Sequence, residues 1–246
     1  MSKTNFIIKQ AAVPGSMDLY IYDDVAGDST DWWSGVVTES ETSANFIKNQ
    51  LEAAGEIQNI NIYINSYGGE VKEGLGIYNL LKRHPAQKTV YVDGFACSIA
   101  SVIAMAGDKV IMGTNTLMMI HHASMCVYGN AEELRKAAND IEVIDSASCS
   151  SYLAKAGNKL TQEALITLLN GQTWLSATQC LEYGLADEIA GVEDKTITVA
   201  KQRLKQSVED EIKQHKDPLK VPKELEIQKT NAEKLMAALK IKFTEV

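Results

Sequence analysis

The most constraining feature of this sequence is a series of short β-branched segments that alternates with helical segments. Residues 59–65 (NINIYIN) and 89–93 (TVYVD) have the apolar alternation of strands. Residues 43–54 and 71–82 have the apolar spacing of helices. Strands that alternate with helices are joined by crossover connections, so this order predicts an α/β fold with a mainly parallel core sheet.

The same pattern predicts the elements on either side of this region. The first 33 residues indicate an irregular opening with one or two strands, because short apolar runs there are broken by turn residues. A small-residue helix is expected over 98–106, where Gly107 stops it. Further strands are predicted over 109–113 and 116–120, and further helices over 131–156, 161–169 and 176–183.

The composition changes after about residue 194. From there to residue 246 the chain is rich in Lys, Glu and Gln and contains no glycine. We expect one domain over 1–193, followed by a charged tail over 194–246 that is helical or partly disordered. Helical stretches are predicted at 199–215 and 223–242, either as a solvated tail or as an arm that docks on a partner chain.

Charge and composition exclude several classes of function. The net charge of −8 argues against nucleic acid or an anionic membrane as the main partner, because both favour a basic surface. No apolar run approaches the roughly 18 residues of a membrane span, and the N-terminus does not resemble a secretory signal. The four cysteines and four histidines have no ligand spacing, so we expect no metal, no cofactor and reduced thiols in the cytoplasm.

Unusual residues follow three of the predicted strands, and open parallel sheets place their chemistry at the carboxyl ends of strands. Gly68 and Gly69 either turn backbone N–H groups towards a cleft or only make a tight turn. Ser98 begins a predicted helix and has small neighbours. It is either a nucleophile on a sharp strand-to-helix turn or only the cap of the helix. His121 and His122 follow an apolar strand. Either one of them is a general base, or one is structural and the other exposed.

Taken together and in this order, these segments resemble the proteolytic subunit of Clp protease, in the Clp protease/crotonase fold group. The resemblance covers roughly residues 17–192. It implies a parallel core sheet with crossover helices and a long handle helix from residue 131. The similar segments are 63–69 (YINSYGG), 94–98 (GFACS), 119–121 (MIH) and 175–187 (LSATQCLEYGLAD).

The resemblance also implies a role for individual residues. Ser98 matches the nucleophile and His121 the general base, whereas the neighbouring His122 matches no role in the family. The backbone N–H groups of Gly69 and Ile99 match the oxyanion hole. The implied reaction is acyl transfer: Ser98 attacks a peptide carbonyl, His121 takes its proton, and water hydrolyses the resulting ester.

Two positions depart from the family pattern. Tyr67 stands where the family usually has proline. Gln172 stands where the family has the aspartate of its catalytic triad. Gln172 or Asn170 could accept the Nδ1–H of the histidine and set its tautomer, but neither stabilises an imidazolium by charge. Loss of that charge in a triad can lower kcat by on the order of 10⁴.

The resemblance leads to three hypotheses for function. The first is a serine endopeptidase, ATP-independent or Clp-like, that is encoded by a phage and acts in capsid maturation, since residues 173–174 (TW) resemble the phage and prophage branch. The second is a catalytically weak ring that serves assembly or scaffolding. The third is a crotonase-type acyl-CoA enzyme.

The resemblance implies polypeptide substrates, with capsid or scaffold proteins among them, and a homo-oligomer built as a heptameric ring or a stacked double ring. An ATPase ring is a further partner of the family, although the sequence shows no docking surface for one. The expected location is the cytoplasm of a bacterial host or the prohead.

Overall fold

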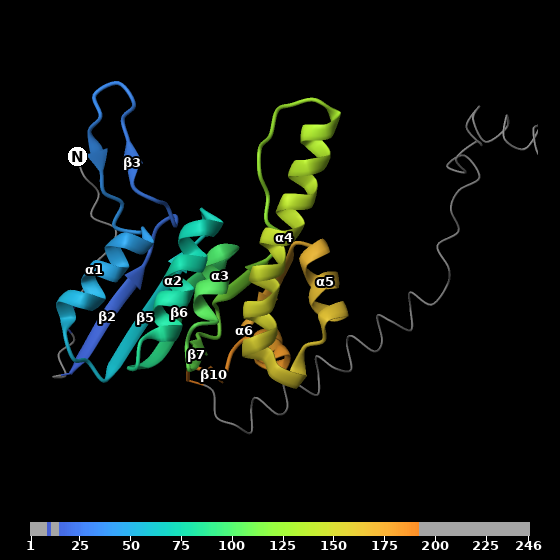
Figure 1. Ribbon diagram of the computed structural model, residues 1–246. Coiled ribbons are helices and arrows are strands. Elements are labelled where there is room, and N and C mark those ends of the chain that lie inside the picture. Colours follow the sequence, from blue (N-terminus) through green and yellow to red (C-terminus); the bar gives the residue numbers. More distant parts are fainter. Residues whose placement is uncertain (1–8, 11–14, 192–246) are drawn as a thin grey trace, which may run out of the picture. The chain divides into compact units, whose positions relative to one another are not determined.

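A mainly parallel sheet forms the centre of the protein (Figure 1). The computed structural model describes residues 9–10 and 15–191, so the predicted tail over 194–246 lies outside the described residues. The predicted α/β class with a parallel core sheet is confirmed. The parallel strands, in spatial order, are β2 (Ser16–Ile21), β5 (Asn59–Ser66), β6 (Gln87–Cys97), β7 (Lys109–Met112) and β10 (Glu188–Ile189), and β1 (Lys9–Gln10) pairs antiparallel with β2.

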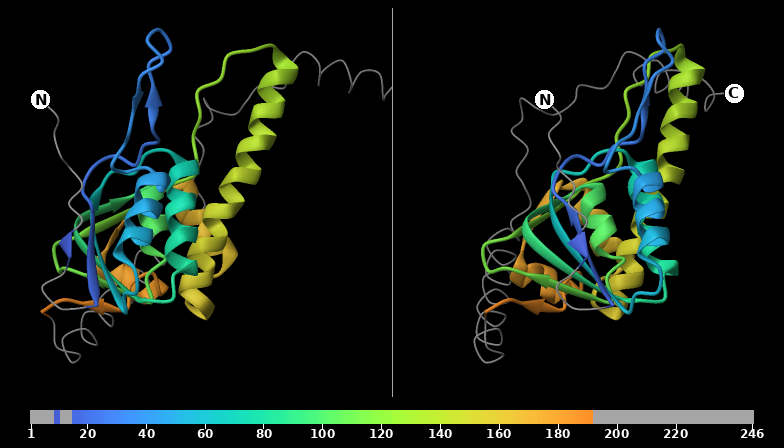
Figure 2. Two further views of the ribbon diagram at one scale, coloured as in Figure 1. Left: turned by 60° about the vertical axis from the view of Figure 1, so that its left-hand side comes forward. Right: turned by 90° about the vertical axis from the view of Figure 1, so that its left-hand side faces the viewer.

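Three helices cover one face of this sheet: α1 (Ala44–Ala54), α2 (Val71–Arg83) and α3 (Ile99–Ala104), as the two views in Figure 2 show. Alternate side chains of β5 form the buried side, where Ile60, Ile62 and Ile64 are fully enclosed. Ser43 is the N-cap of α1, since its side chain accepts a hydrogen bond from the backbone N–H of Phe46.

The strand predicted to end at residue 93 continues through Gly94 to Cys97. Its last residues pair with β8 (Leu117–Ile120), which supplies hydrogen-bond partners that the local sequence does not reveal. β9 (Thr173–Ser176) then pairs antiparallel with β8, and no strand is predicted there from the sequence. This second set of pairings places the end of β6 beside the end of β8, where the candidate residues lie.

The long helix predicted over 131–156 is observed over the same residues as α4 (Ala131–Ala156). A capping box joins Asn130 and Glu133 at its start, and Gly157 ends it with positive φ. The chain continues through a 3₁₀ turn, η1 (Gly157–Lys159), to α5 (Gln162–Asn170) and α6 (Ala177–Tyr183). No helix in the described part of the chain has the length and hydropathy to cross a membrane.

A hairpin of β3 (Ser29–Thr30) and β4 (Val37–Thr38) is an element that the sequence pattern does not predict. It extends away from the sheet on the same side as the first half of α4 (Figure 2). Its tip carries Trp32 and Trp33, which pack edge to face and are more than four-fifths exposed.

Candidate active site

Ser98 occupies the sharp turn between β6 and α3. Its backbone has φ 52° and ψ −129°, a conformation in which a side chain is strained. The turn is held in place because the N–H of Ser98 donates to the carbonyl of Met119 on β8, at 2.8 Å. The residues that follow in α3 are all buried, so packing of this helix fixes the position of the serine.

The Ser98 hydroxyl and the His121 imidazole are in direct contact. Ser98 Oγ lies 2.8 Å from His121 Nε2, although 23 residues separate them in the sequence. In the tautomer that carries its proton on Nδ1, His121 accepts the hydroxyl hydrogen of Ser98. This is the geometry that a general base requires to activate a nucleophile.

The Gly68–Gly69 turn approaches Ser98 closely. A Cβ atom on Gly68 would lie 2.7 Å from the Cβ of Ser98, and Gly68 and Gly69 have φ values of 103° and 146°. Val25 pairs with Gly69 in a parallel bridge: it donates to the Gly68 carbonyl and accepts from Glu70 N–H. In such a bridge the N–H of the central residue, here Gly69, points away from the partner strand.

The buried hydroxyl groups of Ser101 and Tyr152 stabilise the turn at Ser98. Ser101 Oγ donates to the carbonyl oxygen of Ser98 at 2.5 Å and lies 2.6 Å from the hydroxyl of Tyr152. Tyr152 comes from α4 and is almost fully buried; burial raises its pKa well above the ordinary value, so the phenol stays neutral. The long helix is thereby linked to the carbonyl of the candidate nucleophile.

Gln172 lies opposite His121 when the β8–β9 register is extended. Met119 pairs with Trp174 and Ile120 with Thr173, so the next pair along the ladder is His121 with Gln172. The backbone of Gln172 has a positive φ of 45°. Among the residues that the structure describes, the hydrogen bond of the His121 ring is to Ser98, and none joins it to Gln172. The orienting role of Gln172 stays a prediction.

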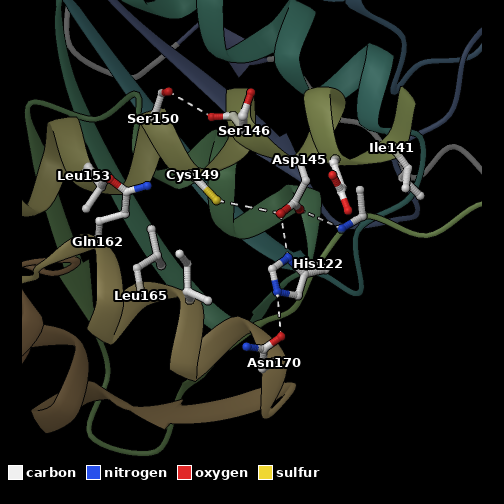
Figure 3. A pocket seen from close by; sticks show the side chains of 13 residues that line it. His122, Ile141, Asp145, Ser146, Cys149, Ser150, Leu153, Gln162, Leu165 and Asn170 are labelled. Carbon is white, nitrogen blue, oxygen red and sulfur yellow. Dashed lines mark hydrogen bonds and ion pairs between the residues drawn. The ribbon is translucent and has the colours of Figure 1, made fainter. Parts of the chain in front are cut away.

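His122 has two hydrogen-bond partners, one on α4 and one at the end of α5, and the sequence analysis assigns it no role. Its Nδ1 lies 2.5 Å from Asp145 Oδ2 on α4, and its Nε2 lies 3.2 Å from Asn170 Oδ1 at the end of α5. Figure 3 shows the imidazole between these two groups. Asn170, named above as a second candidate to orient His121, therefore contacts His122 instead.

Asp145 is a residue that sequence reasoning missed. Besides His122, it accepts the backbone N–H of Ala123 at 2.9 Å and so holds the segment that follows His121 against α4. It also lines a cavity of about 680 Å³ between α4 and α5 (Figure 3). Its mid-helix position and its distance of 23 residues from His122 provided no local signal.

The chemistry of this arrangement is that of a hydroxyl nucleophile beside an imidazole base, at the N-terminal end of a buried helix. Within the described ranges, no group of three His, Cys, Asp or Glu side chains is arranged to hold a metal ion.

Comparisons with known proteins agree with this fold. The family model for Clp protease matches residues 36–193. Three proteins named ATP-dependent Clp protease proteolytic subunit are similar to this chain. That of Deinococcus radiodurans is 29% identical over 193 residues, covering 77% of this chain and 93% of the relative. That of Ostreococcus tauri is 30% identical over 67% of this chain and 82% of the relative, and that of Porphyromonas gingivalis 30% over 60% and 68%.

The fold defines the class as an α/β protein with a mainly parallel core sheet. The chain belongs to the Clp protease family.

Proposed function

We propose that this chain is a serine endopeptidase in which Ser98 is the nucleophile and His121 the general base. The observation that carries the proposal is the 2.8 Å contact between Ser98 Oγ and His121 Nε2 at a strained strand-to-helix turn. Ser98 attacks a peptide carbonyl while His121 takes its proton. His121 then returns the proton to the leaving amine, and water hydrolyses the acyl ester by the same path.

The backbone N–H groups of Gly69 and Ile99 form the proposed oxyanion hole. The outward direction of the Gly69 N–H supports this role, as does the position of Ile99 N at the first turn of α3. An ideal Cβ on Gly68 would lie 3.2 Å from Ile99 N, so the glycine turn and the helix start are adjacent. Donors placed in this way stabilise the charge that develops on a tetrahedral intermediate.

The test is the labelling of Ser98 by a fluorophosphonate probe, together with cleavage of fluorogenic peptides. Wild type is expected to be labelled, and the label and the cleavage are expected to disappear in Ser98→Ala and in His121→Ala. Persistence of labelling at the wild-type rate in His121→Ala would contradict the role of the base.

The side chain at position 172 is proposed to set the turnover rate, kcat. A glutamine can orient the Nδ1–H of His121 but does not stabilise its cation, so we expect Gln172→Asp to raise kcat by at least tenfold. Asn170→Asp is the matched control, because Asn170 contacts His122 and not His121. An unchanged kcat in Gln172→Asp, with Ser98→Ala inactive, would mean that another group orients His121.

The proposed biological role is maturation of a phage capsid, with capsid or scaffold polypeptides as substrates, in the host cytoplasm or in the prohead. Its support is the Thr173–Trp174 pair ahead of the Leu-Ser-Ala run, which resembles phage and prophage members of the family. Co-expression with the capsid and scaffold proteins of the same genome tests this role. Their cleavage is expected with wild type and not with Ser98→Ala.

The second candidate function is a scaffolding ring with weak catalysis. The absence of any hydrogen bond between Gln172 and His121 in the described part of the chain favours it. We further propose that the chain assembles as a heptameric ring or a stacked pair of rings through α4. Retention of assembly in Ser98→Ala, with normal capsid formation, would support scaffolding over proteolysis.

A further inference from the structure

The peptide unit between Ser98 and Ile99 carries two groups at the candidate active site. Its N–H belongs to Ile99 and is one of the two proposed oxyanion donors, whereas its carbonyl belongs to Ser98. The peptide bonds in the described part of the chain are all trans, so this carbonyl and this N–H lie in one plane and point in nearly opposite directions. A hydrogen bond that fixes the Ser98 carbonyl therefore also fixes the direction of the Ile99 N–H.

Ser101 donates two hydrogen bonds to that carbonyl. Its backbone N–H lies 3.0 Å from the Ser98 oxygen, and its hydroxyl lies 2.5 Å from the same oxygen. A carbonyl oxygen has two lone pairs, so both acceptor positions of Ser98 are filled. Ile99 is the first residue of α3, and its N–H has no acceptor inside the helix. Ser101 thus fixes one side of a peptide unit whose other side carries a donor that the helix does not use.

Tyr152 on α4 continues the chain of hydroxyl groups. Its oxygen lies 2.6 Å from Ser101 Oγ. The single hydroxyl hydrogen of Ser101 is donated to Ser98, so the hydrogen between the two hydroxyl groups comes from Tyr152. Burial raises the pKa of Tyr152 well above its ordinary value, so the phenol keeps the hydrogen that it donates. Consecutive hydrogen bonds polarise one another, and the Tyr152 bond therefore strengthens the bond from Ser101 to Ser98.

Packing of the core does not require these hydroxyl groups. Ser101 is fully buried, Tyr152 is 1% exposed, and the other residues of α3 are all apolar. Burial of a hydroxyl group is costly unless the group is hydrogen-bonded, so alanine and phenylalanine would fill the same space without this cost. The two hydroxyl groups therefore form a polar link through an apolar layer, and the link ends at the peptide unit of the oxyanion donor.

We propose that Ser101 and Tyr152 are positioning residues for the oxyanion hole. The chain of hydrogen bonds from Tyr152 through Ser101 to the Ser98 carbonyl directs the Ile99 N–H at the oxyanion of the tetrahedral intermediate. The inference rests on the proposed peptidase function and adds two residues to it. Both act through the Ile99 N–H and not by contact with the substrate.

The first experiment measures kcat and KM separately with a fluorogenic peptide. Ser101→Ala removes the hydroxyl donor, and Tyr152→Phe removes the phenolic O–H but keeps the ring. We expect kcat to fall about tenfold in Ser101→Ala and about fivefold in Tyr152→Phe, with KM within about twofold of wild type. These losses are smaller than the roughly 10²–10³ that follows removal of an oxyanion donor itself, because the Ile99 N–H stays present but is less well directed.

Two further measurements show whether the residues act as one chain. A peptide aldehyde forms a tetrahedral adduct with a serine nucleophile, so its inhibition constant should rise by about the factor by which kcat falls. In the Ser101→Ala background, Tyr152→Phe should have no further effect on kcat, because Tyr152 acts through Ser101. Losses of kcat that multiply in the double variant would overturn this part of the proposal.

Ser151→Ala is the matched control. Ser151 is buried beside Tyr152 on α4, and its hydroxyl donates to the carbonyl of Ala147 on the same helix. The variant is expected to keep kcat within about twofold of wild type. Thermal unfolding is measured for each variant, and the kinetics are run well below the lowest Tm, so that loss of folded protein is not counted as loss of kcat.

Three results would overturn the proposal. The first is a wild-type kcat in both Ser101→Ala and Tyr152→Phe. The second is a rise in KM in place of a fall in kcat, which would indicate a role in substrate binding. The third is an equal fall of kcat in Ser151→Ala, which would mean that loss of any buried hydroxyl group has this effect.

A ¹⁵N NMR measurement on isoleucine amides reports the peptide unit without catalysis. The nitrogen shift of Ile99 responds to hydrogen bonding at the Ser98 carbonyl, because both atoms belong to one conjugated unit. The signal is assigned by its disappearance in Ile99→Val. It is expected to move in Ser101→Ala and Tyr152→Phe, and to stay at its wild-type position in Ser151→Ala.

The two proposals fail in distinguishable ways. If Ser98 is not labelled and no peptide is cleaved, but the Ile99 signal moves as expected, the peptidase function fails and the orientation of the peptide unit stands. If wild type is labelled and active, and neither kcat nor the Ile99 signal changes in Ser101→Ala and Tyr152→Phe, the positioning proposal fails alone.

Discussion

At the scale of single residues, the site depends on a backbone conformation that its sequence does not favour. Ser98 is a non-glycine residue with positive φ, and such a conformation costs of order 1–3 kcal/mol. The cost is tolerated because β6, β8 and α3 fix the turn from both sides, through Met119 and Ser101. Strain of this kind at a candidate nucleophile is what a catalytic turn requires.

Replacement of Ser98 by glycine is therefore expected to stabilise the fold. Ser98→Gly should be more stable than Ser98→Ala by about 1 kcal/mol, because glycine adopts positive φ without a steric cost. Thermal unfolding should show this as a Tm about 2–4 °C higher than that of Ser98→Ala. Equal or lower stability of the glycine variant would contradict strain at this turn.

The cysteines differ in reactivity because they differ in burial. Burial raises the pKa of Cys97 and Cys149 to about 11 and that of Cys180 to about 12, so at pH 7 these groups are neutral thiols with a thiolate fraction of ~10⁻⁴ or less. Cys126 is exposed. A maleimide at pH 7 should modify one thiol rapidly in the native protein and all four after unfolding.

Cys126→Ser is the control for this measurement and should remove the fast modification. As the pH rises towards the raised pKa values, thiolate forms at Cys97, Cys149 and Cys180 and their modification should accelerate. Rapid modification of Cys97 at pH 7 would show that the end of β6 opens in solution.

At the scale of elements, α4 holds the end of β8 in place. Asp145 accepts the Ala123 N–H and contacts His122, so one carboxylate of the helix fixes the two residues that follow His121. Tyr152 of the same helix reaches the Ser98 turn through Ser101. The two candidate catalytic residues are therefore positioned by one helix.

Removal of the Asp145 carboxylate should disturb this arrangement. Asp145→Ala leaves the Ala123 N–H without its acceptor, so we expect a loss of about 1–3 kcal/mol in the free energy of unfolding and slower fluorophosphonate labelling of Ser98. Asp140→Ala, at an exposed position of the same helix paired with Lys136, should cost under about 0.5 kcal/mol. Urea unfolding and labelling rates provide both measurements, and equal effects of the two variants would contradict the positioning role.

The elements that sequence reasoning recovered are those with local signals. The end of α4 is marked in the sequence by Gly157, and the structure adds a capping box of Asn130 and Glu133 at its start. β9 (TWLS) and the strands of the β3–β4 hairpin (ST and VT) were missed because they contain no run of three apolar residues, unlike β7 (KVIM) and β8 (LMMI). Such strands are stabilised by pairing with a neighbouring strand. A short window of sequence does not contain that neighbour.

At the scale of the whole molecule, α4 carries apolar side chains that the described part of the chain leaves exposed. Its first half extends beyond the sheet (Figures 1 and 2), and Leu134, Val143 and Ile144 of this helix are exposed. Exposed apolar side chains on a projecting helix agree with the proposed assembly of copies through this element.

Val143→Glu should therefore weaken self-association and leave the fold intact. Val143 is largely exposed in the single chain, so a charge there has little effect on folding but is costly in an apolar interface. Sedimentation velocity should show a shift towards smaller species. Asn49→Glu, the same change of charge on the exposed face of α1, should not shift the distribution. A monomeric wild type, or an unchanged distribution in Val143→Glu, would contradict assembly through α4.

The sequence by itself determined the α/β class, most helix bounds and the candidate pair Ser98 and His121, because periodicity, caps and motif order are read along the chain. Only the tertiary structure decided that the Ser98 hydroxyl reaches His121, that Asp145 holds His122, that Asn170 contacts the second histidine, and that Tyr67, Phe95 and Trp174 meet. Each of these contacts joins residues that are far apart in the sequence. Their distances depend on strand register and helix packing, which are properties of the assembled fold.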